Sequence, residues 1–147
     1  MPSPTPPPDM ARDDEAGAIA AAVYFLTELY PYTVNSKDTD AWLAMSHPDC
    51  IFCASTVDTV EGLKLSGERA AIAPIRITSQ SSEGIDPVRF GVFLAIETGP
   101  DRRFGADGSL TGEVPITYGK ASIAITRQAG IWLVRGIELV PVESRPT

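Results

Sequence analysis

The chain has two cysteines, Cys50 and Cys53, and their spacing makes them the side chains best placed to do chemistry. Such a pair can form a local disulfide, carry out thiol redox chemistry, contribute to a metal site or remain as inert buried thiols. The pair follows the turn His47-Pro48-Asp49 and precedes a predicted helix, whereas a thioredoxin-like pair follows a strand in a βαβ unit. We therefore favour a disulfide, which leaves no free thiol in an oxidising compartment.

A metal site is the alternative that involves His47, the only histidine of the chain. With Cys50 and Cys53 it forms an HxxCxxC string, to which Asp49 could add a carboxylate. A structural zinc ion needs about four ligands, and the sequence offers no second group of cysteines or histidines. An open three-ligand site and a reactive thiol at a helix start stay open as alternatives, and no cofactor is predicted.

A second candidate group consists of aromatic residues that could line a pocket. They are Tyr24, Tyr30 and Trp42 in predicted helices, and Phe90 and Trp132 in predicted strands. Aromatic residues at regular spacing belong to a hydrophobic core more often than to a site. A catalytic pocket would also need inward-facing acids, and Glu97 and Glu138 fall out of phase with the larger apolar residues nearby, which predicts solvent exposure.

The length of 147 residues and an ordinary share of hydrophobic residues predict a single globular domain. The formal net charge is −7, and the chain has no cluster of lysine and arginine. An acidic surface repels phosphate groups, so nucleic-acid binding and electrostatic docking on anionic lipids are disfavoured. No stretch of the sequence is long and apolar enough to span a bilayer.

The composition changes along the chain and predicts three segments. Residues 1–12 are rich in proline, which predicts a flexible linker or an extended polyproline spacer. Residues 13–142 carry the apolar periodicity of a folded domain, and residues 143–147 are expected to form a C-terminal tail. The proline-rich segment suits a spacer that holds an exported domain away from a surface.

Within the domain, helical patterns come first and strand patterns second. Apolar residues at three- and four-residue steps predict a long first helix from Asp13, which Pro31 should end or kink. Two shorter helices are expected over 40–45 and from an Asp49 cap to about residue 64.

Alternation with a period of two follows and predicts four strands. Their expected ranges are 71–77, 88–96, 116–127 and 131–140, with turns and a loose loop over 99–112. Helices followed by strands are typical of an α+β fold with an antiparallel sheet.

The order of elements over residues 13–142 resembles the nuclear-transport-factor-2-like fold, in which N-terminal helices pack on a strongly bent, mainly four-stranded antiparallel sheet. The features that carry the resemblance are the long aromatic first helix, the short helix of Asp38–Leu43 and the closing strand of Gly130–Ile137. Residues 46–53, which read Ser-His-Pro-Asp-Cys-Ile-Phe-Cys, also resemble a segment of actinobacterial lipoprotein domains of unknown function.

This resemblance implies an extracytoplasmic domain of the cell envelope, anchored to the membrane through a lipidated segment outside this sequence. It transfers no catalytic residue, so the leading hypothesis is a non-catalytic binding or accessory module. Its expected partner is a small molecule or an envelope protein, and the fold suggests a homodimer. The alternatives are a small isomerase, cyclase or dehydratase that uses a pocket inside the cone, and a thiol redox or metal site over residues 47–53.

Overall fold

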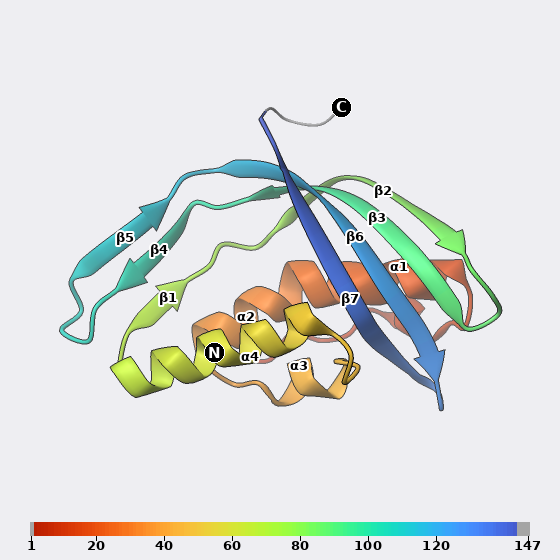
Figure 1. Cartoon of the computed structure of the whole chain (residues 1–147), viewed down its shortest axis with the longest axis horizontal. Coiled ribbons are helices and arrows are strands. Elements are labelled where there is room, and N and C mark those ends of the chain that lie inside the picture. Colours follow the sequence, from red (N-terminus) through yellow and green to blue (C-terminus); the bar gives the residue numbers. More distant parts are fainter. Residues whose placement is uncertain (1, 144–147) are drawn as a thin grey trace.

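One long helical stretch forms the floor of the molecule (Figure 1). In the computed structural model, which describes residues 2–143, it consists of α1 (Glu15–Val23), the π-helical turn η2 (Tyr24–Leu29) and α2 (Tyr30–Ser36). Two further helices, α3 (Asp40–Ala44) and α4 (Ile51–Ser66), lie beside it. The predicted order of a long, a short and a third helix is therefore confirmed.

Pro31 changes the long helix without ending it. Proline has no N–H to donate to Thr27, so regular α-helical bonding fails at this point. The chain passes through η2, where the Tyr30 amide bonds to the Phe25 carbonyl five residues back. The Thr27 hydroxyl donates to the carbonyl of Val23 at 2.7 Å. The predicted interruption is thus a local change of hydrogen bonding inside a continuous helix.

Two antiparallel sheets arch over the helices (Figure 1). The larger sheet has the strand order β2-β3-β6-β7, and the smaller one has the order β1-β4-β5. The strands are β1 (Arg69–Ala71), β2 (Arg76–Gly84), β3 (Arg89–Thr98), β4 (Asp101–Phe104), β5 (Leu110–Val114), β6 (Thr117–Gln128) and β7 (Ile131–Val142). The predicted class, α+β with helices on a bent and mainly four-stranded sheet, is confirmed.

The strand predictions fail in three places. Strand β2 continues to Gly84, well beyond the expected end at residue 77, because its serine-rich second half lacks apolar alternation. Pro74 divides the first predicted strand, because the chain leaves the small sheet after Ala71 and joins the large sheet only at Arg76. The prediction of a loose loop over 99–112 is wrong, since this stretch contains β4 and most of β5. Both strands are short and rich in charged and small residues, so they lack the apolar alternation that reveals a strand in a sequence.

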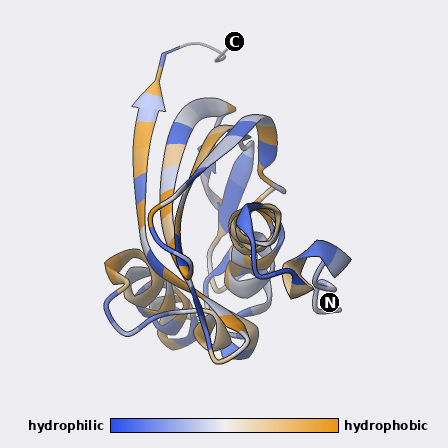
Figure 2. Ribbon diagram, turned by 90° about the vertical axis from the view of Figure 1, so that its right-hand side faces the viewer, coloured by the Kyte–Doolittle hydropathy of each residue, from blue (hydrophilic) through white to orange (hydrophobic). Residues whose placement is uncertain are grey.

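The hydrophobic core lies between the long helix and the concave face of the large sheet. Phe25 stacks on Trp42 with ring centroids 3.8 Å apart, and Phe90 meets Trp132 edge to face at 5.5 Å. Figure 2 shows hydrophobic residues on both layers, interspersed with polar ones. The alternating residues Val92, Leu94, Ile123, Ile125 and Val134 supply the sheet side of this core and are almost fully buried.

The proline-rich segment ends in contact with the domain. Pro8–Ala11 forms a short 3-10 helix, η1, and Met10 packs against the core. This docking could not be predicted, because prolines interrupt apolar periodicity and the domain contacts the main-chain carbonyls of Met10 and Ala11. Residues 144–147 of the expected C-terminal tail lie outside the described residues.

Gly17 should be intolerant of a side chain, because a Cβ atom at this position would lie 2.1 Å from the carbonyl oxygen of Arg12. We expect Gly17→Ala to destabilise the protein by about 1–3 kcal/mol through overpacking. Gly62→Ala is the matched helical control, since a Cβ there meets nothing within 4 Å, and it should stabilise by about 1 kcal/mol. Urea denaturation measures both changes, and equal stabilisation by the two variants would contradict the close approach.

Candidate functional site

A cavity of about 260 Å³ lies where the small sheet meets α2 and α4. It lies beside the small sheet, whose strands β1, β4 and β5 are at the left in Figure 1. Residues from the two helices and all three strands of the small sheet line it. They are Tyr30, Val34, Thr59, Leu63, Ala70, Ile72, Asp101, Arg102, Arg103, Gly112, Glu113 and Val114.

The inner wall of the cavity is apolar. Val34 and Leu63 come from the two helices, Ala70 comes from β1, and all three are buried. They form one cluster with Val60, and Ile72 packs against its edge. Ala70 is paired with Arg103 across β1 and β4. Because Ala70 is buried, a small side chain faces the interior at this point. The wall can therefore hold an apolar ligand surface.

Tyr30 and Asp101 bring polar chemistry to the cavity. Burial raises the pKa of Tyr30 above its usual value, and the nearby negative charge of Asp101 raises this pKa further. The Asp101 carboxylate accepts a hydrogen bond at 2.9 Å from the amide of Ala73 through Oδ1. The site thus combines a protonated hydroxyl, which can donate, with a carboxylate, which can accept.

Two ion pairs of the small sheet border the cavity. Arg103 Nη2 lies 3.3 Å from Glu68 Oε1, and Arg102 Nε lies 3.7 Å from Glu113 Oε1. Arg102, Arg103 and Glu113 are largely exposed and Glu68 is partly exposed, so each pair contributes little stability. Asp101 falls in the stretch 99–112 that was expected to form turns and a loose loop. Strand β4 starts there instead and brings the Asp101 carboxylate to the cavity.

The five aromatic residues predicted to line a pocket lie in different parts of the structure, with Tyr30 near Trp42 and Phe90 against Trp132. Tyr30 lines the cavity. Trp42 is fully buried between the helices, and Phe90 packs on Trp132 in another part of the core. Tyr24 is also buried, and its hydroxyl donates to the carbonyl of Pro4 at 3.0 Å. Trp132 borders a separate hollow beside the N-terminal segment.

The cysteines form the predicted disulfide, Cys50–Cys53. Both residues are buried, and the Cys53 amide donates to Cys50 Sγ at 3.1 Å. Cys50 therefore caps α4, and the prediction that Asp49 would do so is wrong. His47 instead accepts a hydrogen bond at 3.0 Å from the Asp49 amide through Nδ1. Within residues 2–143, no three His, Cys, Asp or Glu side chains gather as a metal site.

The two acids expected at the surface differ in their surroundings. Glu138 is exposed on β7. Glu97 is partly buried and forms an ion pair with Arg76 on the neighbouring strand. Neither lines the cavity, whereas Asp101 on β4 does and provides an acid there.

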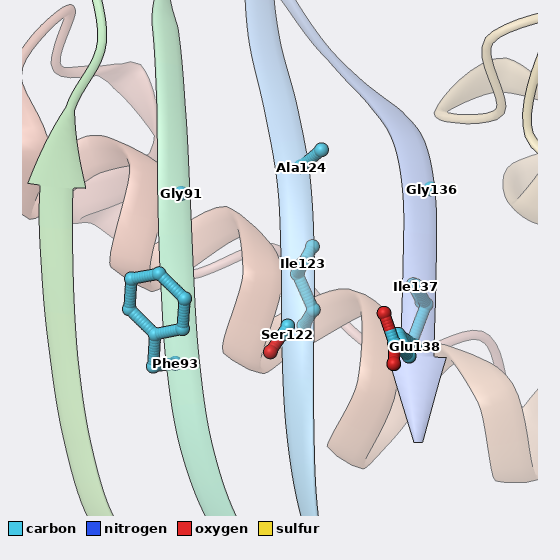
Figure 3. Close-up of a pocket in the computed structure, with 8 residues that line it drawn as sticks. All are labelled: Gly91, Phe93, Ser122, Ile123, Ala124, Gly136, Ile137 and Glu138. Carbon is cyan, nitrogen blue, oxygen red and sulfur yellow. The ribbon is translucent and has the colours of Figure 1, made fainter. Parts of the chain in front are cut away.

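A second, shallower depression of about 390 Å³ lies on the outer face of the large sheet. Figure 3 shows Gly91, Ala124 and Gly136 side by side on β3, β6 and β7, with Phe93 and Ser122 in the next row. The depression arises because glycine and alanine leave the sheet surface bare. It is more open to solvent than the cavity beside Tyr30, so it is a weaker candidate for a small-molecule site.

No protein-family model and no curated protein matches the sequence. Solved structures do match the fold. The chain has the nuclear-transport-factor-2-like fold. The intermembrane-space region of the chloroplast protein ARC6 has a TM-score of 0.64 at 9% identity, with 89% of this chain and 99% of that chain covered.

Two bacterial structures show how widely proteins of this fold differ. An IcmL-like type IV secretion system protein of Legionella pneumophila has a TM-score of 0.61 at 12% identity, covering 91% of this chain and 97% of its own. A candidate scytalone dehydratase of Novosphingobium aromaticivorans has a TM-score of 0.57 at 14% identity, covering 89% and 87%. Identities this low establish the fold alone.

Tyr30 should titrate above the ordinary tyrosine pKa of about 10. Asp101→Asn should lower the pKa of Tyr30 only in part, because burial is the larger cause of the shift. A raised folded-state pKa stabilises the protein at neutral pH, and this contribution is lost as pH rises through that pKa. Tyrosine ring NMR over an alkaline titration measures the values. An ordinary pKa that Asp101→Asn leaves unchanged would contradict the site geometry.

Proposed function

We propose that the protein is a non-catalytic binding module that takes one small, mainly apolar molecule into the cavity beside Tyr30. The observation that carries the proposal is the combination of an apolar wall with two convergent polar groups, Tyr30 and Asp101. This combination is the usual pattern of small-molecule sites.

The cavity limits the chemistry of the ligand. Its volume of about 260 Å³ is small for a drug-sized molecule, since such pockets usually span roughly 300–1,000 Å³. A compact ring or short branched chain would fill the space between Val34, Leu63 and Ala70. A hydroxyl or amide on the ligand could accept from Tyr30 and donate to Asp101.

We also propose that the domain works outside the cytoplasm, at the cell envelope. The disulfide supports this location, because disulfides persist in oxidising compartments. Within residues 2–143, no helix is long and apolar enough to cross a membrane. Attachment through a lipidated segment rests on the motif at residues 46–53 and on the proline-rich segment before the domain.

A variant that fills the cavity tests the binding proposal. Ala70→Phe places an aromatic ring in the cavity, whereas Ala124→Phe places one in the depression on the outer face. We expect compact neutral alcohols and amides to shift the methyl NMR signals of Val34 and Leu63. Ala70→Phe should weaken this binding at least tenfold, because the ring occupies the same space, and Ala124→Phe should leave it unchanged.

Two outcomes would contradict the proposal. One is that no compound in such a set shifts the cavity methyl groups of the native protein. The other is that Ala124→Phe abolishes binding while Ala70→Phe, shown to be folded by its NMR spectrum, does not.

An enzyme is the second candidate function, and the pairing of Tyr30 with Asp101 favours it specifically. A carboxylate can remove a proton from a carbon or an alcohol, and a neutral tyrosine hydroxyl can stabilise the developing oxyanion. An isomerase or a dehydratase could use these two groups, and one structural neighbour is a candidate dehydratase. Conversion of a bound compound by the native protein, and its loss in Asp101→Asn with binding retained, would favour this candidate.

A further inference from the structure

The N-terminal segment ends in a set of contacts that its composition does not predict. We propose that residues 4–12 form a docked strap, held on the surface of the domain through hydrogen bonds to its main-chain carbonyl groups. The partner of this interaction surface is a segment of the chain itself. Three side chains of the domain donate to the carbonyls of the strap. They are Tyr24 on the long helix, Arg127 on β6 and Trp132 on β7.

At one end of the strap, side chains of β6 and β7 donate hydrogen bonds to the carbonyl oxygens of η1. Trp132 Nε1 donates to the Met10 carbonyl at 2.9 Å. Arg127 donates to the same carbonyl through Nη1 and to that of Ala11 through Nη2, both at 3.3 Å. Arg127 Nε also lies 2.7 Å from the Asp13 carboxylate. Arg127 and Trp132 thus hold Met10 and Ala11 of the strap, and Arg127 also holds the adjoining Asp13.

Arg127 makes the largest number of polar contacts to the strap and to the adjoining Asp13. Its side chain is only 15% exposed, and its guanidinium lies 5.0 Å from the centre of the Trp132 ring. Every hydrogen bond that this guanidinium makes among residues 2–143 goes to Met10, Ala11 or Asp13. The strap thus covers the guanidinium and supplies its acceptors, and undocking would exchange these charge-assisted hydrogen bonds for bonds to water.

The other end of the strap is held at Tyr24. This residue is buried, and its hydroxyl donates to the Pro4 carbonyl at 3.0 Å. Between the two ends, the prolines at positions 6–8 favour an extended backbone and lose little conformational entropy on docking. Gly17 lets the chain pass close to α1, since a Cβ there would meet the Arg12 carbonyl. The strap is therefore accommodated from the helix and from the sheet.

A docked strap would fix the place where any preceding chain meets the domain. The strap is gripped near the β6–β7 turn, while the cavity lies under β1, β4 and β5 at the other end of the molecule (Figure 1). Any chain that precedes the strap would then hold the domain at a fixed attachment instead of by a free spacer. The attachment would lie at the Pro4 end of the strap, where Tyr24 holds it.

Backbone NMR relaxation of the full chain tests the strap. Rigid backbone gives order parameters near 0.85 and flexible segments fall below about 0.6, so we expect docked values for residues 9–12. Trp132→Phe keeps a ring but removes the indole donor, and Arg127→Met removes the guanidinium. Each should make residues 9–12 flexible, whereas Arg135→Met, which removes an exposed ion pair with Asp49, should not.

A strap that is flexible in the native chain would overturn the proposal. So would order parameters for residues 9–12 that stay near 0.85 in Trp132→Phe, because that variant removes the shortest contact to the Met10 carbonyl. If Arg127→Met fails to fold, Trp132→Phe decides alone.

Discussion

Trp42 is the side chain through which the helical layer holds together. It is fully buried, its ring stacks on Phe25 at 3.8 Å, and its indole Nε1 donates to the Cys53 carbonyl at 3.1 Å. It therefore joins α3, the disulfide at the start of α4 and the long helix in one contact. The Tyr30 ring lies 5.8 Å away, and Phe52, between the two cysteines, lies 6.0 Å from Tyr30. The side chain that reaches the cavity is thus positioned by the packing of the helices.

The cavity follows from a mismatch between the helical layer and the arch of strands. Apolar side chains of the long helix fill the space under the large sheet. The small sheet extends over the ends of α2 and α4 (Figure 1). Its inward positions include Ala70 and Gly112, which are too small to close the space. A cavity at this end is therefore a property of the fold, and the residues around it decide its chemistry.

The residues that periodicity reveals were predicted well, and those of the short strands were not. Val92, Leu94 and Ile123 alternate clearly, because these strands bury one face and expose the other. Asp101 lies in a charged strand whose partners are distant in sequence, so only tertiary structure shows that it faces Tyr30. The disulfide could be proposed from the sequence, since its two cysteines lie three residues apart after a turn and outside any thioredoxin-like pattern.

Docking of the N-terminal strap was hidden for a different reason. Arg127 and Trp132 bind main-chain carbonyls, which every residue type offers, and so the prolines carry no signal of the contact. Gly17 gave no sign either, because a glycine in a helix has several explanations until the neighbouring chain is seen. Sequence patterns report what a side chain prefers, and they miss what the backbone of a distant segment does.

The proposed binding function requires that the cavity be present and apolar in solution. Xenon binding tests this requirement without knowledge of the natural ligand. Xenon enters apolar cavities and leaves polar, hydrated ones largely alone. Methyl NMR spectra recorded under xenon pressure should show saturable shifts at Val34, Leu63 and Ile72, with little change at Ile123 beneath the outer depression. Shifts confined to the sheet face, or none at the three cavity residues, would contradict it.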